Sequence, residues 1–212
     1  MRILSLMLVL CLGACVTAPS YQNVQKTEGE INARDVNYKV TGLFYRDPPD
    51  CVSVFPSLAK DRPAMGQALS VAFARHLGEK VDRVIFPRKR KTIEHENGYD
   101  LTEKQDRLRY SLKTQCRFYA RAQLYDLGDE YVGVFAEKHL GVRLDLYRIE
   151  DDQPIWQAAH TVWRADGGVP SSPLGLIGGM ASAAMFKTDQ EIMPSLIDDA
   201  MRRMIRTLPP GI

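Results

Sequence analysis

The chain has 212 residues, of which 45% are hydrophobic and 25% are charged, a composition typical of a globular domain and not of a disordered or fibrous protein. Its formal net charge of +2 at pH 7 is nearly neutral, so we expect no nucleic-acid partner. The length is suited to one domain with its own hydrophobic core.

The first residues have the layout of a bacterial secretory signal. Arg2 supplies a positive charge, and an almost unbroken apolar run covers residues 3–12. A run of about ten residues is too short to span a bilayer, which takes roughly 20. Small residues follow where a peptidase cuts, so we predict a signal peptide over residues 1–14.

Leu12-Gly13-Ala14-Cys15 resembles the lipobox of bacterial lipoproteins. The resemblance implies that Cys15 receives a diacylglyceryl group and that the new amino terminus is acylated, for example with palmitate. Two or more acyl chains attach a protein stably to a membrane. Because Val16, and not an aspartate, follows, the resemblance implies the outer membrane, with the domain facing the periplasm. An ordinary secretory signal that contains a cysteine is the alternative.

A flexible tether is predicted over residues 15–35, which are polar and lack a sustained period. A single domain then covers residues 36–212. Cys51 and Cys116 are the cysteines that remain in it, and an exported protein meets an oxidising environment. They are therefore candidates for a disulfide, with two buried free thiols as the alternative.

Apolar spacing predicts the first half of the domain. Met65, Leu69, Phe73 and Leu77 recur at every fourth residue, which indicates a helix that packs one face on a sheet. Asp61 is the predicted N-cap. In chain order we expect an edge strand or extended segment over 36–45, strands over 51–55 and 81–86, and helices over 65–77 and 103–113.

Residues 88–91 are a block of four consecutive basic side chains. Such a block suits phosphate headgroups, a glycan or a nucleic acid. Glu94 and Glu96 follow at once and reduce its field, so we expect a solvated loop.

The second half shows the clearest strand pattern. Apolar and polar side chains alternate over residues 116–124, and again over 140–149 and 155–164. We expect turns at 128–130 and 150–153 and a short strand over 131–135. The prediction is an α/β fold with a mixed, largely antiparallel sheet of four to six strands and helices packed on it.

Residues 167–186 are rich in glycine and small side chains and carry almost no charge. No Gly-Lys-Ser or Gly-Lys-Thr sequence follows the glycines, so this is not a phosphate loop. Either the segment folds back on the sheet as a loop and short helix, or it is an apolar flap in which Leu174, Ile177 and Met180 contact a partner or a membrane. An amphipathic helix follows over 189–208.

No catalytic or metal-binding pattern is recognisable in the sequence. His76, His95, His139 and His160 are not spaced as metal ligands, and no Gly-x-Ser-x-Gly motif occurs. We therefore expect no enzyme activity, no cofactor and no metal.

The two tryptophans are candidates for partner binding. Trp156 and Trp163 are an odd number of residues apart, so in a regular strand they point to opposite faces. One should lie in the core, and the other is available as a surface aromatic for a protein partner.

The order of elements over residues 51–208, with Val52-x-Val54-x-Pro56 before the first helix and Trp156 after a turn, resembles two groups of periplasmic lipoproteins. These are the curli-secretion-type and penicillin-binding-protein-activator-type domains, related in fold to the amino-terminal domain of the Tol translocation protein. The resemblance implies a non-catalytic domain that binds other envelope proteins.

We predict an outer-membrane lipoprotein that is an accessory, scaffold or assembly factor for an envelope complex, and an oligomer is compatible with this role. The alternative is a lipid- or glycan-binding carrier, or transport auxiliary lipoprotein, that uses the apolar segment over residues 173–186.

Overall fold

The protein is described by a computed structural model that covers residues 21–23, 36–132, 135–167 and 182–210. The strands are β1 (Tyr21–Asn23), β2 (Val36–Val40), β3 (Cys51–Val54), β4 (Arg83–Ile85), β5 (Phe118–Val132), β6 (Phe135–Arg148) and β7 (Pro154–Gly167). The helices are α2 (Gly42–Arg46), α3 (Pro63–Leu77), α4 (Pro87–Asn97), α5 (Lys104–Thr114) and α7 (Ile192–Ile205), with a further helical stretch over 182–188.

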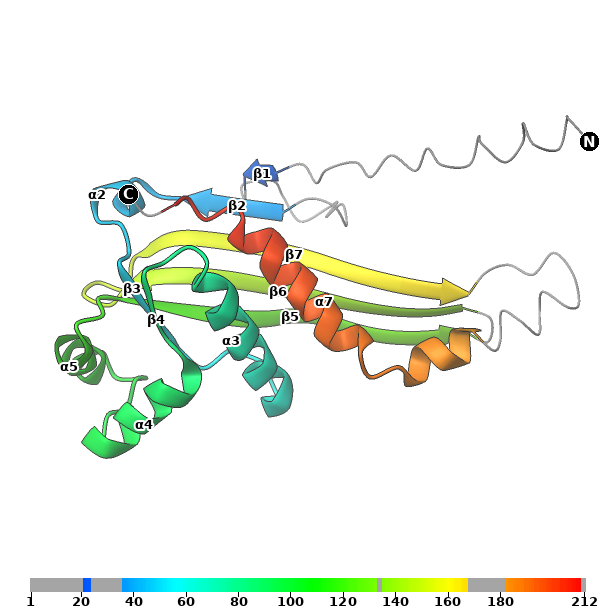
Figure 1. Ribbon diagram of the computed structural model, residues 1–212, viewed down its shortest axis with the longest axis horizontal. Helices are drawn as coiled ribbons and strands as arrows, with labels where there is room; N and C mark the ends of the chain where they lie inside the picture. The colour runs from blue at the N-terminus through cyan, green and yellow to red at the C-terminus, as the bar shows by residue number, and fades with distance from the viewer. Residues whose placement is uncertain (1–20, 24–35, 133–134, 168–181, 211–212) are drawn as a thin grey trace, which may run out of the picture.

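The strands form one mixed sheet in the order β1-β2-β7-β6-β5-β3-β4 (Figure 1). β5, β6 and β7 are an antiparallel meander, β2 pairs antiparallel with β7, and β3 runs parallel to both β4 and β5. The α/β class and the largely antiparallel sheet are confirmed. Among the described residues the sheet has seven strands, one more than the predicted four to six, because β1, inside the predicted tether, pairs with β2 at the edge.

Two hydrophobic clusters lie on opposite faces of the sheet, because neighbouring residues of a strand point to opposite sides. The larger one joins the sheet to α3 and α7 through side chains such as Leu69, Phe73, Leu144 and Leu146. The smaller one, which includes Phe55, packs around the disulfide beneath α4 and α5.

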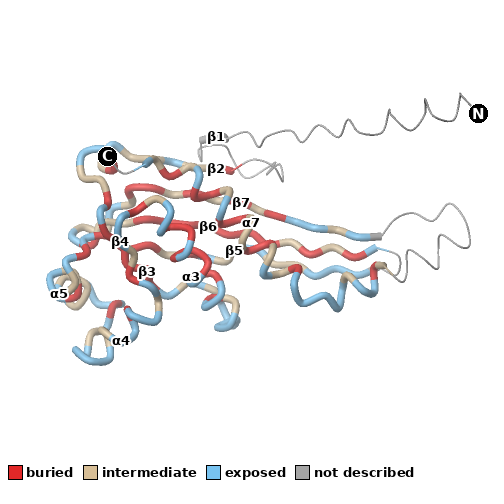
Figure 2. Tube along the Cα trace, viewed as in Figure 1, coloured by how far each residue is buried: buried red, intermediate tan, exposed pale blue. Residues whose placement is uncertain are grey.

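The sheet has two parts that differ in how they are covered (Figure 2). In the body, around β3 and the near ends of β5–β7, helices pack on both faces. The arm comprises the far ends of the same strands, residues 125–132, 135–141 and 161–167. Its inner face contacts α7 and the 182–188 stretch, as where Lys138 Nζ donates to the Lys187 carbonyl.

Two predictions for the helical region are wrong. Residues 88–91 lie in α4 instead of a solvated loop, because Pro87, at the first helical position, has a φ that suits a helix start. Asp61 is not the N-cap of α3. It has a φ of 54°, in the left-handed region, and Arg62 takes the cap position.

The turn predicted at residues 128–130 is also wrong, because β5 continues through it to Val132. Gly128 instead allows His139 of β6 to pack closely on β5, because a Cβ at position 128 would lie 2.0 Å from Cε1 of His139. The strand predicted over 131–135 is therefore the end of β5 and the start of β6, whereas the turn at 150–153 is confirmed. The predicted helix over 189–208 is shorter, at Ile192–Ile205.

Several predictions lie outside the described residues. These are the signal peptide, the lipobox with Cys15, and the candidates Leu174, Ile177 and Met180. In the described part of the chain, no helix has both the length and the apolar character needed to cross a membrane.

Candidate functional site

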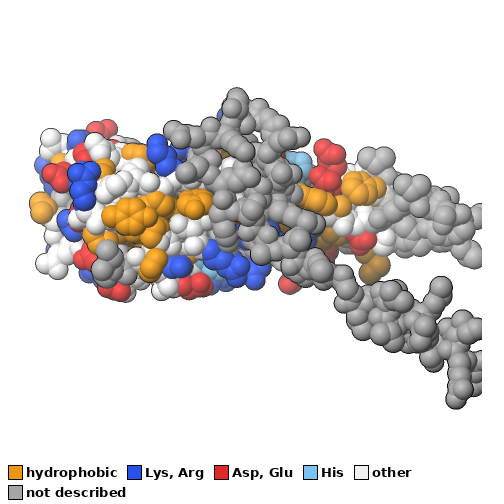
Figure 3. Space-filling model, turned by 90° about the horizontal axis from the view of Figure 1, so that it is seen from above, with side chains coloured by type: hydrophobic (Ala, Val, Ile, Leu, Met, Phe, Trp, Pro, Cys, Tyr) orange, Lys and Arg blue, Asp and Glu red, His pale blue; other side chains and the backbone are white. Residues whose placement is uncertain are grey.

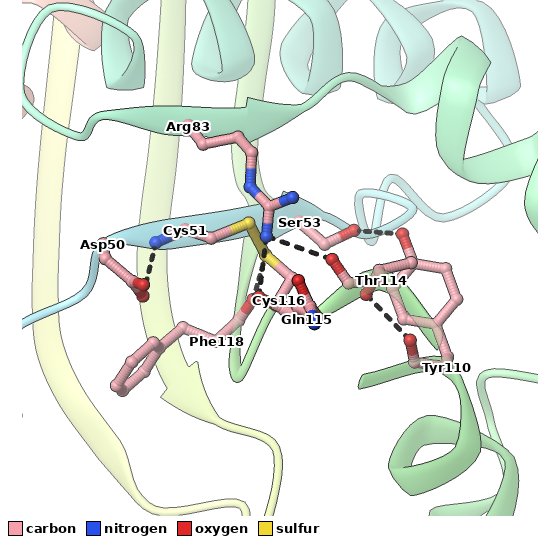
Figure 4. The surroundings of a disulfide bond; sticks show 9 residues. All are labelled: Asp50, Cys51, Ser53, Arg83, Tyr110, Thr114, Gln115, Cys116 and Phe118. Atoms are coloured by element: carbon pink, nitrogen blue, oxygen red, sulfur yellow. Dashed lines mark hydrogen bonds between the residues drawn. A yellow bond between two sulfur atoms is a disulfide. The ribbon is translucent and has the colours of Figure 1, made fainter. Parts of the chain in front are cut away.

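The disulfide predicted between Cys51 and Cys116 is present, and both residues are buried (Figure 4). It joins the start of β3 to the segment that precedes β5. Arg83 Nη2 supports this segment by donating to the carbonyls of Thr114, at 3.0 Å, and Gln115, at 2.7 Å. The pair is enclosed and cross-links residues 65 positions apart, so its role is structural.

The two tryptophans lie on opposite faces of β7, as their odd spacing predicts. Trp156 is fully buried, and its Nε1 donates to Thr207 Oγ1 at 3.1 Å. The prediction that Trp156 could bind a partner is therefore wrong, because its ring is buried in the core. Trp163 is 52% exposed on the outer face of the arm.

Trp163 belongs to a group of side chains from three strands, which we call the Trp163 patch. Its members share the outer face of the arm: Tyr125, Asp126 and Glu130 of β5, Glu137 and His139 of β6, and Thr161 and Trp163 of β7. Five of them, all except Tyr125 and Glu130, line a shallow open pocket of about 280 Å³. A register shift between Leu124 and Asp126 places the β5 residues on this side.

His139 lies at the centre of the Trp163 patch, between two carboxylates. Its Nε2 is 3.4 Å from Asp126 Oδ1, and its Nδ1 is 3.6 Å from Glu137 Oε1. The imidazole ring fits there because Gly128 opposite has no side chain. The backbone thus fixes the position of the ring between the acids.

Tyr125 and Thr161 connect the outer strands of the arm. Their hydroxyl oxygens are 2.9 Å apart, and Gly141 between them leaves room for the tyrosine ring, since a Cβ there would lie 2.5 Å from Tyr125 Cε2. Partial burial of the ring raises the pKa of Tyr125.

The Trp163 patch is acidic. Glu130 and Glu137 are directly opposite in register, and like charges in that position repel. The basic residues of the arm, Lys138 and Arg164, alternate onto the inner face. Figure 3 shows the molecule from above, where charged side chains of both signs lie among hydrophobic ones outside the grey residues.

A second feature is an apolar groove of about 940 Å³ between α3 and α7, with Met65, Val71 and Met193 among its lining. At one side of the groove, Asp198 of α7 lies 2.8 Å from Nε2 of His76 and forms an ion pair with Arg75, both on α3. The hydrogen bond to His76 lowers the pKa of Asp198. His76 itself is buried, so this contact joins the two helices.

Within the described ranges, no three His, Cys, Asp or Glu side chains are placed to hold a metal ion. Sequence reasoning missed Asp126, Glu137 and His139 as members of one patch. Glycines inside a strand pattern indicate close packing, and Gly128 was the available signal.

Comparisons with known proteins show likeness only in structure. No family model matches the chain, and no curated protein matches it. Among solved structures, the PelC dodecamer from Paraburkholderia phytofirmans aligns at 13% identity over 80% of this chain and 95% of that one, with a TM-score of 0.42.

Lipoprotein GNA1162 from Neisseria meningitidis aligns at 16% identity over 66% of this chain and 97% of that one, with a TM-score of 0.42. A minor lipoprotein from Acinetobacter baumannii aligns at 10% identity over 77% and 98%, with a TM-score of 0.38. Bacterial lipoproteins are thus among the structures to which the chain is similar, and no activity or partner is transferred from them.

Proposed function

We propose that the protein is an outer-membrane-anchored periplasmic lipoprotein, a non-catalytic accessory or scaffold of an envelope complex, and that the Trp163 patch binds its protein partner. The exposed tryptophan ring carries this proposal. An indole ring left half in water on the face of a sheet is the kind of side chain that contributes most to protein interfaces.

The charges of the Trp163 patch indicate the chemistry of the partner. Asp126, Glu130 and Glu137 share the outer face of the arm with the indole and have no Lys or Arg among their described register partners there. A guanidinium or ammonium group can contact the face of Trp163 and a carboxylate at once. The partner segment is therefore basic, and its association weakens as salt rises.

A photo-crosslinking amino acid at position 163, introduced into the protein in intact cells, tests the interface. We expect one dominant crosslinked envelope protein, with the attachment point in a segment rich in Lys or Arg. The same substitution at Leu112, which is 81% exposed on α5, is the control. Equal products at both positions, or none at 163, contradict the proposal.

The anchor has a separate test. Cys15→Ala should release the protein into the soluble periplasmic fraction and abolish labelling by radioactive palmitate. A variant that stays in the membrane fraction contradicts lipidation at Cys15 and leaves the crosslinking result unaffected.

The second candidate function is lipid carriage, which the apolar groove between α3 and α7 favours. Native mass spectrometry of the purified protein should then detect a bound lipid. Val71 lines the groove and is exposed, so Val71→Asp should abolish binding of that lipid. A lipid-free spectrum of the unmodified protein excludes this function.

A further inference from the structure

A cleft of about 510 Å³ lies between the first turns of α3 and α4, away from the Trp163 patch. Pro63 and Pro87, the first residues of the two helices, both line it. Arg88, Arg90 and Lys91 line it from α4. Three cationic side chains and the starts of two helices therefore surround one hollow.

Both helices begin with a proline, which has no N–H, so the backbone donors at each start come from the residues just after it. The first N–H groups of a helix have no partner within it, and the aligned peptide dipoles make that end positive. Within the described chain, neither Arg62 nor Phe86, the two cap residues, accepts a bond from the helix through its side chain. Neither first turn contains an acidic residue that would offset the positive end.

Arg90 shows that the cleft is built and is not a chance cluster of surface charge. The residue is only 7% exposed, and its Nη1 donates to Glu94 Oε2 at 2.5 Å. Its Nε is buried and has no hydrogen-bond partner among the described residues. A buried guanidinium with an unused donor is costly unless an acceptor reaches it.

The other basic side chains divide between two places. Arg88 and Lys91 are exposed at the rim of the cleft, whereas Lys89 lines a different pocket beside β4. The Ser57 and Ser70 hydroxyls, which also line the cleft, are 2.6 Å apart, and Ser70 donates to the Gly66 carbonyl. These hydroxyls are occupied, so the cations and the helix N–H groups are the available donors.

We infer that this cleft binds a phosphomonoester group. Arg88 and Lys91 close on its oxygens from the rim, and the backbone N–H groups at the start of α4 donate from below. The charge of Arg90 is offset by Glu94, so Arg90 contributes its unpartnered Nε donor at the wall of the cleft. The group belongs either to a small soluble phosphate compound or to a lipid headgroup. The inference is independent of the proposed function, because it uses neither the Trp163 patch nor the anchor.

The test uses the full chain with Cys15→Ala, so that no acyl chain contributes to membrane binding. One arm titrates inorganic phosphate calorimetrically. The other measures co-flotation with vesicles of phosphatidylcholine, with and without phosphatidic acid. The variants are Arg88→Ala with Lys91→Ala, and Lys89→Ala is the control of equal charge type on the same helix.

We expect the double variant to weaken binding about tenfold or more and Lys89→Ala to change it by less than about twofold. Binding of inorganic phosphate alone supports a soluble ligand, and binding only to vesicles with phosphatidic acid supports a headgroup. Absence of binding in both arms overturns the inference. So does an equal loss in Lys89→Ala, which would show only diffuse attraction between charges. Circular dichroism of the double variant checks that both helices remain.

Discussion

The body and the arm are built from the same three strands, yet β5, β6 and β7 meet different surroundings at their two ends (Figure 2). In the body, side chains on both faces enter hydrophobic clusters beneath helices. In the arm, the described helices cover the inner face, and the outer face presents Trp163 with the acids around it. The body therefore holds most of the stabilising contacts, whereas the arm has side chains free for recognition.

The disulfide is the strongest test of this division, because it fastens the body alone. Cys51→Ala with Cys116→Ala removes a cross-link between residues 65 positions apart, worth about 4 kcal/mol in the chain-entropy estimate. Urea unfolding should show that loss in the free energy of unfolding. Binding through the Trp163 patch should persist at low temperature, and its disappearance in a variant that is still folded would contradict the division.

A pair of leucines gives the next largest difference. Leu69 of α3 is fully buried against the sheet, and Leu112 of α5 is 81% exposed. Leu69→Ala should cost about 3 kcal/mol, because it removes buried methyl groups and leaves a cavity. Leu112→Ala should change the free energy of unfolding by less than about 0.5 kcal/mol. Comparable losses in the free energy of unfolding for the two variants would contradict the assignment of Leu69 to the core of the body.

The leucines also show how far the sequence predicts the fold. Apolar residues at every fourth position through Leu69, and at every second position over residues 116–124, mark buried faces. They do so because the side chains on one face of a helix or strand recur with the period of that element. Leu112, by contrast, lies in the predicted helix over 103–113 and is exposed. On a short helix with charge on most sides, periodicity does not select one buried face.

The Trp163 patch was only partly predictable. The odd spacing of Trp156 and Trp163 predicts that they lie on opposite faces of a strand. It does not predict which side chains surround Trp163. Asp126 and His139 meet because a bulge shifts the register of β5 against β6, and register depends on pairing with another strand. Likewise, the burial of Arg90 depends on the packing of α4 and not on the basic run itself.

A smaller effect concerns the contact between α3 and α7 in the body. The His76 hydrogen bond holds the pKa of Asp198 below the ordinary aspartate value of 3.8. The stabilisation is therefore present at higher pH and is lost as pH falls below that value, through the lowered pKa. Because the Asp198 side chain is about half exposed, solvent screens the pair, and Asp198→Asn should cost less than about 1 kcal/mol near neutral pH.

Urea unfolding of both proteins near neutral pH and at about pH 3 checks this sign, because groups that do not contact Asp198 titrate equally in the two. The difference between them should shrink in acid. A difference that grows as pH falls would show that the neutral carboxyl is the stabilising form.

The smallest expected change in stability separates the arm from the body most directly. Trp163→Phe should leave the free energy of unfolding within about 0.5 kcal/mol, since the ring stands in solvent. The remaining Trp156 is enclosed, so its emission should be blue-shifted and poorly quenched by acrylamide.

In Trp156→Phe the remaining Trp163 should be strongly quenched, and a basic peptide such as octa-arginine should reduce that quenching. Efficient quenching of Trp156 in the folded Trp163→Phe protein would contradict its burial, and protection of Trp163 without peptide would show that the outer face of the arm is covered.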